Sequence, residues 1–226
     1  MGYKTMDANE AVSRVSYKFT EIAGIYPITP ASPMAEKVDV LASKGEINFW
    51  GNKVKVIEME SEKGAIATVH GALQAGVLAT TYTASQGLLL MIPSIYKMAG
   101  EMLPGVIHVA ARSLSTHSLS IFGDHQDIYA VRQTGACMLS SSSVEEAYHM
   151  AMVSHLASIK SSLPFINFFD GFRTSHEIDK VKEIDLSKLE TLIDKKALRK
   201  FRDNGMISGA TTRGTAENED VYFQHT

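Results

Sequence analysis

"LATTYTASQGLLLMIPSIYKMAGEMLPGVIHVAAR", residues 78–112, contains the pattern that decides the fold. Two short β-rich runs, 78–84 and 105–112, flank a longer segment with helical spacing, 85–102. Neither run alternates strictly between apolar and polar residues, which is typical of strands that are covered on both faces. The stretch therefore predicts a strand–helix–strand unit of a parallel sheet, with a kink in the helix at Pro93.

The alternation of strand and helix continues on both sides of this unit. Further predicted strands are 24–27, 53–58, 136–141 and 164–170. Helical spacing fills the intervals, in residues 7–24, 32–45, 61–76, 127–133 and 143–160. Six strands that alternate with helices predict an α/β fold with a doubly wound, mostly parallel six-stranded sheet and helices on both faces.

Local signals place the first two helices. Asp7 and Glu10 form a D-x-x-E capping box at the start of the first helix, and Gly24 is expected to end that helix. Ser32 is a favourable N-cap for the second helix, and Pro33 is a favourable first residue.

The chain changes character after Arg173. The residues that follow are charged and helical in spacing, without the earlier strand signal, and the last residues are polar. We expect one domain over residues 1–180, followed over residues 181–226 by a charged helical linker and the truncated start of a further segment.

Composition excludes several classes of function. The 226 residues carry a formal net charge of −3 and no run of Lys and Arg, which argues against a nucleic-acid or membrane-surface partner. Neither a signal peptide nor a segment of transmembrane length is present, so we expect a cytoplasmic protein. The single cysteine, Cys137, excludes a disulfide framework and a cysteine-held iron–sulfur cluster within this chain.

Candidate site residues follow the predicted strands, because ligands of open parallel sheets bind beyond the carboxyl ends of the strands. Thr29, Glu62 and Arg112 all lie there. The sequence therefore predicts that a hydroxyl, a carboxylate and a guanidinium converge at this edge.

Each of these residues also has a structural interpretation. Glu62 could simply favour the positive end of the helix that it begins. Thr29 lies between Pro27 and Pro30 and could be a turn residue, although rigid prolines also lower the entropy cost of presenting its hydroxyl. Arg112 follows an apolar run, where a merely solvated charge is unusual, so ligand binding and a structural role are equally good interpretations.

Two other motifs carry less information. The glycines of GALQAG, 71–76, lie within a helix and form no dinucleotide fingerprint. Asp124, His125 and Asp127, in FGDHQD, are better explained as a hydrogen-bonded loop and helix cap than as metal ligands. We expect no metal site in this chain.

Five stretches of this sequence resemble the pyruvate:ferredoxin (flavodoxin) oxidoreductases. They are GIYPITPASPMAE (24–36), IEMESEKGA (57–65), TASQGLLLMIP (83–93), HVAARSLSTHSLSIFGDH (108–125) and PFINFFDGFRTSHE (164–177). The resemblance runs from about Met6 to Val181 and resumes in RGTAENEDVYFQ (213–224). It indicates the N-terminal, pyrimidine-binding domain of the long single-chain form of these enzymes.

The resemblance implies a thiamine-diphosphate pyrimidine-binding fold that supplies half of a cofactor site. Such enzymes decarboxylate pyruvate, transfer the acyl unit to coenzyme A and pass electrons through [4Fe–4S] clusters to ferredoxin or flavodoxin. Mg²⁺ and the clusters are expected in domains that this chain lacks, and the complete enzyme is expected to be a homodimer.

The resemblance also implies roles for single residues. Glu62 matches the glutamate that hydrogen-bonds the pyrimidine ring and supports proton relay. Thr29 and Arg112 match residues that contact the substrate carboxylate or carbonyl, and with Glu62 they form the expected catalytic set. Tyr26 and Pro27 are expected near the cofactor ring.

Three hypotheses follow. The first is a part of this enzyme that is inactive without the rest of its chain. The second is a catalytically inert folded fragment that binds the remaining domains through apolar helix residues, namely Leu88, Leu89, Met91 and Ile92. The third is an unrelated nucleotide-binding α/β domain, which the lack of a phosphate-binding glycine loop disfavours.

Overall fold

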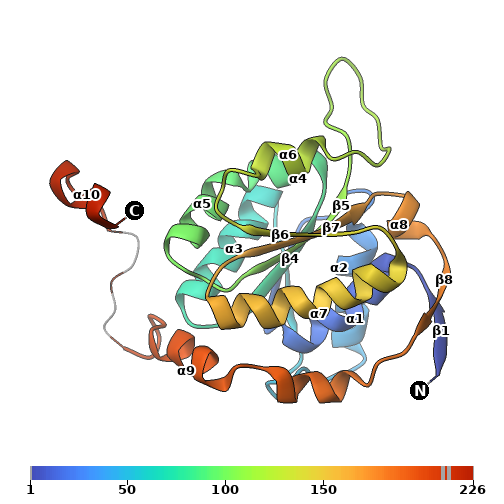
Figure 1. Ribbon diagram of the computed structural model, residues 1–226, viewed down its shortest axis with the longest axis horizontal. Coiled ribbons are helices and arrows are strands. Elements are labelled where there is room, and N and C mark those ends of the chain that lie inside the picture. Colours follow the sequence, from blue (N-terminus) through green and yellow to red (C-terminus); the bar gives the residue numbers. More distant parts are fainter. Residues whose placement is uncertain (1, 210–211, 213–214, 226) are drawn as a thin grey trace.

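The computed structural model describes residues 2–209, 212 and 215–225, and its centre is a parallel sheet. The six strands of this sheet are β2 (Ile22–Ile25), β3 (Lys55–Glu58), β4 (Ala79–Thr83), β5 (Val106–Ala111), β6 (Cys137–Ser141) and β7 (Phe165–Asp170). They lie in the order β3-β2-β4-β5-β7-β6, and each neighbouring pair is parallel (Figure 1). The six strands expected from the sequence are therefore confirmed.

Helices cover both faces of this sheet (Figure 1). One face carries α1 (Ala8–Phe19), α2 (Ser32–Ser43) and α7 (Val144–Ser161). The other face carries α3 (Glu62–Gln74), α4 (Ser85–Leu90), α5 (Ile92–Gly100) and α6 (Gln126–Val131). The expected fold class, a doubly wound α/β layer, is confirmed.

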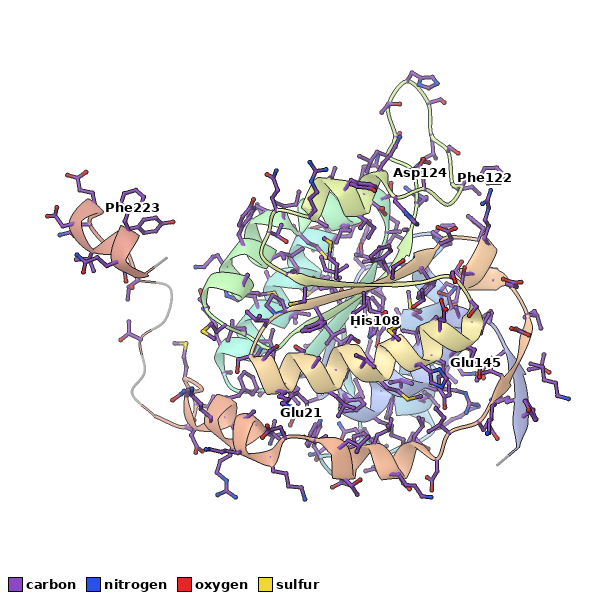
Figure 2. The ribbon with its side chains drawn as sticks, viewed as in Figure 1. Glu21, His108, Phe122, Asp124, Glu145 and Phe223 are labelled. Atoms are coloured by element: carbon purple, nitrogen blue, oxygen red, sulfur yellow. The ribbon has the colours of Figure 1, made fainter. Side chains whose placement is uncertain are left out.

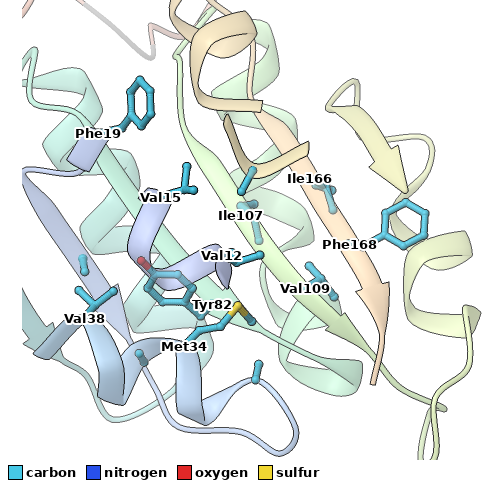
Figure 3. Packing of buried hydrophobic residues seen from close by; sticks show 14 of the residues in the cluster. Val12, Val15, Phe19, Met34, Val38, Tyr82, Ile107, Val109, Ile166 and Phe168 are labelled. Atoms are coloured by element: carbon cyan, nitrogen blue, oxygen red, sulfur yellow. The ribbon is translucent and has the colours of Figure 1, made fainter. Parts of the chain in front are cut away.

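The central strands are held by apolar packing against α1. Ile107 and Val109 of β5 and Ile166 of β7 pack with Val12 and Val15 of α1, and all five are fully buried (Figure 3). Close packing of this kind leaves little room for side chains to shift. The core therefore gives rigid support to the ends of the strands, where the candidate site residues lie.

The first helix begins as expected but ends earlier. Asp7 accepts a hydrogen bond from the Glu10 backbone N–H at 2.7 Å, which confirms the cap. The helix ends at Phe19, so the prediction that Gly24 ends it is wrong. Gly24 lies within β2, where a Cβ atom would lie 2.5 Å from the Ala65 carbonyl oxygen, so glycine allows α3 to approach the strand.

Two other helix boundaries differ slightly from expectation. Ala31, not Ser32, is the N-cap of α2, although Pro33 lies in the first turn as expected. Met91 separates α4 from α5, so the expected kink is a break between two helices, and Pro93 lies in the first turn of the second. Proline is accepted there because the first N–H groups of a helix have no partner within the helix.

We expect Gly24→Ala to destabilise the domain by about 1–3 kcal/mol, since the methyl group meets the backbone of α3. Gly71→Ala is the matched control, because a Cβ atom on Gly71 has no neighbour within 4 Å. Alanine in place of a helical glycine should stabilise α3 by up to about 1 kcal/mol. Urea unfolding of both variants measures the difference, and equal unfolding midpoints would contradict this account of Gly24.

A second, two-stranded sheet joins distant parts of the chain. β1 (Tyr3–Met6) pairs antiparallel with β8 (Asp179–Lys182). The charged segment after Arg173 therefore contains a strand, and the expectation that it lacks one is wrong. Of the four residues of β8 only Val181 is buried, so the sequence carries almost no strand pattern there. The domain boundary expected near residue 180 falls within β8 and stays a prediction.

Four helical segments complete the described chain: α8 (Arg173–His176), the 3₁₀ helix η1 (Leu186–Leu192), α9 (Lys195–Asp203) and α10 (Glu219–His225). Leu189, Ile193 and Phe201 are buried around η1 and α9, beside α7 (Figure 1). Residues 210–211 and 213–214 of the polar tail lie outside the described residues. No helix in the described part of the chain is both long and apolar enough to cross a membrane.

A buried pair of histidines connects the sheet to α7. The Nε2 atoms of His108 in β5 and His155 in α7 lie 3.1 Å apart, and Nδ2 of Asn167 lies 3.1 Å from Nδ1 of His108. Figure 2 labels His108. One imidazole must donate and the other accept, so at least the accepting ring must be neutral. Burial lowers the pKa of His108 to about 3 and holds the pKa of His155 well below its usual value.

We expect this histidine pair to make the fold less stable as the pH falls from about 6.5, because the unfolded chain takes up protons that the folded chain excludes. Between about pH 6 and pH 5, each buried imidazole should contribute a slope of about 1.4 kcal/mol per pH unit. His155→Phe should remove one such contribution, whereas the exposed control His117→Gln should leave the slope unchanged. Urea unfolding at several pH values measures it, and an unchanged slope in His155→Phe would contradict the explanation.

Candidate active site

The candidate residues follow strands that surround the point where the strand order reverses. From β2 the chain passes to β3 on one side, and it then returns to β4 on the other side of β2. Ligands of open α/β sheets bind beyond the carboxyl ends of the strands at such a switch point. Thr29 follows β2, Glu62 follows β3, and Arg112 follows β5.

Arg112 is buried, with 7% of its surface exposed, and its guanidinium is held on two sides. Nη1 donates to the Thr29 carbonyl oxygen at 2.7 Å, and Nη2 donates to Oε1 of Gln86 at 3.3 Å. Burial lowers the pKa of Arg112, and the negative charges of Asp127 and Glu62 oppose this shift. Arginine nevertheless stays charged at neutral pH, so a cation is fixed at this edge of the sheet.

Glu62 is the first residue of α3. The Ser61 side chain caps this helix by accepting a hydrogen bond from the Gly64 N–H at 3.3 Å, which places Glu62 in the first turn. Glu62 is only 7% exposed, whereas Glu60 is exposed. A carboxylate that only favoured a helix end could remain in solvent, so its burial beside an arginine calls for a further explanation.

Polar groups around α4 pack closely against Gly87, and one of them lacks a hydrogen-bond partner. A Cβ atom on Gly87 would lie 2.6 Å from Oγ1 of Thr83 and 2.7 Å from Oε1 of Glu62, so only glycine leaves space for these groups. Within the described residues, Oγ1 of Thr83 and Nε of Arg112 are buried without a hydrogen-bond partner. Buried polar atoms are normally paired, so these two are available to a bound molecule.

The structure brings Thr29 and Arg112 into direct contact, but through the backbone carbonyl of Thr29 and not through its hydroxyl. Thr29 itself is exposed, as is Pro27, and Tyr26 is half-buried. The charges of Glu62 and Arg112 lie close enough to influence each other. The expected convergence at one edge is therefore found for the charges of Glu62 and Arg112 and for the backbone of Thr29, but not for the Thr29 hydroxyl, and the roles of all five residues stay predictions.

The acidic loop before α6 forms separate hydrogen bonds. Asp124 accepts from the Gln126 N–H at 2.9 Å, and His125 pairs with Asp170 at 2.8 Å. Asp127 is buried and accepts only from backbone N–H groups in the bonds that the structure shows. Figure 2 shows Asp124 in the loop that projects from the sheet edge. These bonds support the interpretation as a hydrogen-bonded loop, whereas the N-cap of α6 is His125, whose side chain makes no capping bond.

Sequence reasoning did not assign Ser85, Gln86 or Asp127 to the site. Ser85 has a φ of 51°, in the left-handed region, and its Oγ lies 2.6 Å from the Ser113 carbonyl oxygen and 2.5 Å from Oε1 of Gln86, so these two acceptors share its one proton. Such a backbone conformation is rare for serine and is enriched at functional sites. The available signal was the position of Ser85 and Gln86 directly after a buried strand.

The fold is that of a doubly wound α/β domain with Glu62 and Arg112 buried at one sheet edge, and comparison with known proteins identifies its class. The chain belongs to the family described as pyruvate flavodoxin/ferredoxin oxidoreductase, thiamine diphosphate-binding, whose pattern matches residues 14–226. The resemblance found in the five sequence stretches is thereby confirmed, and the hypothesis of an unrelated nucleotide-binding domain is wrong.

Individual relatives are much longer than this chain. It is 59% identical over 222 residues to the pyruvate-flavodoxin oxidoreductase of Klebsiella pneumoniae, an alignment that covers 98% of this chain and 19% of that protein. It is 55% identical over 225 residues to the pyruvate:ferredoxin oxidoreductase of Moorella thermoacetica, which covers 99% of this chain and 19% of that protein. The chain therefore spans about a fifth of the length of these relatives.

A solved structure shares the fold. It is a 2-oxoglutarate:ferredoxin oxidoreductase from Magnetococcus marinus, with 2-oxoglutarate, coenzyme A and succinyl-CoA bound. The TM-score is 0.72 at 22% identity, over 83% of this chain and 32% of the other.

Proposed function

We propose that this chain supplies the pyrimidine-binding half of a thiamine diphosphate site in a larger 2-oxo acid oxidoreductase. The complete protein would decarboxylate pyruvate, transfer the acetyl group to coenzyme A and pass electrons to ferredoxin or flavodoxin. Family membership and the names of the relatives support this reaction. The observation that carries the site is the buried pair of opposite charges, Glu62 and Arg112, at the edge where the strand order reverses.

Thiamine diphosphate fits the groups present at this edge. An aminopyrimidine ring exchanges hydrogen bonds with a carboxylate and a hydroxyl, and Glu62 and Thr83 offer these, with an unpaired Oγ1 on Thr83 and both side chains packed closely against Gly87. Tyr26 and Pro27, at the end of β2, would line the ring. When bound, the cofactor supplies the carbon centre that adds to a 2-oxo acid and accepts the electron pair released with CO₂.

Glu62 would hold a proton against a ring nitrogen of the aminopyrimidine. A carboxylate that is 7% exposed competes with little water, so its hydrogen bond to a ring would be strong and directional. Placed carboxylates of this kind act as general acid–base groups. Glu62 would therefore set the protonation state of the ring.

Arg112 and Thr29 would bind the substrate. Pyruvate carries a carboxylate, and the rigid fork of arginine suits this group. The Thr29 carbonyl and the Gln86 amide oxygen orient the guanidinium of Arg112, and its Nε–H is unpaired among the described residues. The exposed Thr29 side chain would contribute its hydroxyl to the same substrate.

The remaining functions would lie in the rest of the protein. The diphosphate and Mg²⁺ would be held by a second domain, and the [4Fe–4S] clusters by domains with the cysteines that this chain, with Cys137 alone, does not supply. The complete enzyme would be a cytoplasmic homodimer.

An inert fragment that only binds the remaining domains is the second candidate. Of the four residues expected on its docking surface, Leu88 and Met91 are fully buried in the core of this domain, so the expectation is wrong for these two, whereas Leu89 and Ile92 are half-buried. Exposed apolar side chains lie instead in the loop after β5, at Leu119, Ile121 and Phe122 (Figure 2). These side chains favour a contact with another domain under either candidate.

The test is pyruvate-dependent reduction of a viologen dye with thiamine diphosphate, Mg²⁺ and coenzyme A. The purified chain is assayed alone and mixed with a separately expressed remainder of the enzyme. Activity only in the mixture supports the proposed half-site. A chain that is folded by circular dichroism, binds the remainder and yields no activity would instead favour the inert fragment.

A further inference from the structure

Asp127 is the most deeply buried acidic side chain of the described chain. It lies in the first turn of α6, with 0% of its surface exposed. Burying a carboxylate is costly unless hydrogen bonds compensate for the lost water. Burial raises the pKa of Asp127, and hydrogen bonds from three backbone N–H groups oppose this shift.

These three bonds connect separate elements. Oδ2 accepts from the Ser85 N–H at 2.8 Å and from the Arg112 N–H at 3.0 Å, while Oδ1 accepts from the Ile128 N–H at 2.8 Å. Ser85 follows β4 and Arg112 follows β5, and these two strands are neighbours in the sheet. One carboxylate oxygen therefore joins the ends of two strands that carry the site. The position of Asp127 in the first turn of α6 would explain only the bond to the neighbouring Ile128 N–H.

The bond to Ser85 also determines where Gln86 lies. Ser85 holds a left-handed backbone, with a φ of 51°, which is unfavourable for a residue that carries a Cβ atom. Its N–H is fixed by Asp127 and its Oγ by the Ser113 carbonyl. Gln86 follows directly, and its Oε1 accepts from Nη2 of Arg112.

We propose that Asp127 is a positioning residue for substrate binding. It fixes the backbone of Arg112 directly and the side chain of Gln86 through Ser85, and so orients the guanidinium toward the substrate carboxylate. Asp127 acts through Arg112 and does not itself touch the substrate. This inference rests on the proposed function of Arg112.

The test is Asp127→Asn in the complete enzyme. Asparagine has one acceptor oxygen in place of two, so at least one of the three bonds is lost. We expect the KM for pyruvate to rise about tenfold, because a displaced guanidinium binds the carboxylate less well. The concentration of thiamine diphosphate that gives half-maximal activity should change less than about twofold, because Arg112 is assigned to the substrate and not to the cofactor.

Asp124→Asn is the matched control. Asp124 is exposed and accepts a backbone N–H from Gln126, but it contacts neither Ser85 nor Arg112. The KM for pyruvate of the Asp124→Asn enzyme should equal that of the wild type. A purely structural role of Asp127 would instead weaken cofactor and substrate binding together, and that result would overturn the inference.

The outcomes separate the inference from the proposed function. A complete wild-type enzyme without pyruvate turnover would overturn both, whereas normal wild-type turnover with an unchanged KM in Asp127→Asn overturns the inference alone. If circular dichroism shows that Asp127→Asn does not fold, Gln86→Met decides, because it keeps the side-chain length and removes the acceptor for Arg112. A KM raised about tenfold supports the inference, and an unchanged KM overturns it.

Discussion

Glu62→Gln in the complete enzyme is expected to lower turnover with pyruvate by about 10²- to 10⁴-fold, the usual contribution of a general acid–base group. Glutamine keeps the size of the side chain and therefore the packing beside Gly87. It carries no charge and cannot take up a proton, so it cannot set the protonation state of a bound ring. Viologen reduction measures turnover, and circular dichroism checks that the fold is intact.

Glu60→Gln is the control for this result. Glu60 lies two residues earlier and has the same chemistry, but it is exposed whereas Glu62 is buried. Its loss should change turnover by less than about twofold, because a solvated carboxylate contributes little at a distance. Near-normal turnover in Glu62→Gln would contradict the proton-holding role, and equal losses in both variants would indicate a general effect of charge.

The parallel sheet was predictable because its strands carry their own signal. All six residues of β5, Val106 to Ala111, are buried, and all of them except His108 are apolar. A strand of that kind needs helices on both faces, and the helical spacing between the strands supplies them. By contrast, β8 buries only Val181, and pairing with β1 is what makes it a strand. Such pairing leaves no pattern in a short charged segment.

Boundaries were less predictable because three-dimensional packing decides them. Glycine often ends a helix, and this is the basis of the expectation for Gly24. In the fold Gly24 serves another purpose, since it lets the Ala65 carbonyl of α3 approach β2. The same residue type therefore satisfies two different requirements, and only the neighbouring helix distinguishes them.

The candidate site was predictable only in part. Glu62 and Arg112 follow strands, so the rule for parallel sheets brings them to one edge. The hydrogen bonds that orient them connect residues far apart in sequence: Asp127 is 42 residues from Ser85, and Thr29 is 83 residues from Arg112. The partner on Thr29 is a backbone carbonyl, which every residue type has, so no residue type could have revealed it.

Arg112→Ala is expected to lower kcat/KM for pyruvate by about 100-fold, mainly through KM, since hydrogen bonds to charged groups contribute about 1.5–3 kcal/mol. The removed guanidinium donates to the Thr29 carbonyl and the Gln86 amide, and neither of these bonds involves Glu62. Cofactor binding should therefore stay nearly normal. Steady-state kinetics with pyruvate and thiamine diphosphate varied separately measures both effects.

Two further variants show whether the shape of the arginine side chain matters. Arg112→Lys keeps the charge but not the planar fork, so it should recover only part of the lost affinity. Arg132→Ala removes an exposed arginine that stacks on Tyr129, and it should behave as the wild type. Full recovery with lysine would show that charge alone binds the substrate. A normal KM for pyruvate in Arg112→Ala would contradict the proposal that Arg112 binds the substrate carboxylate, because binding would then not need this cation.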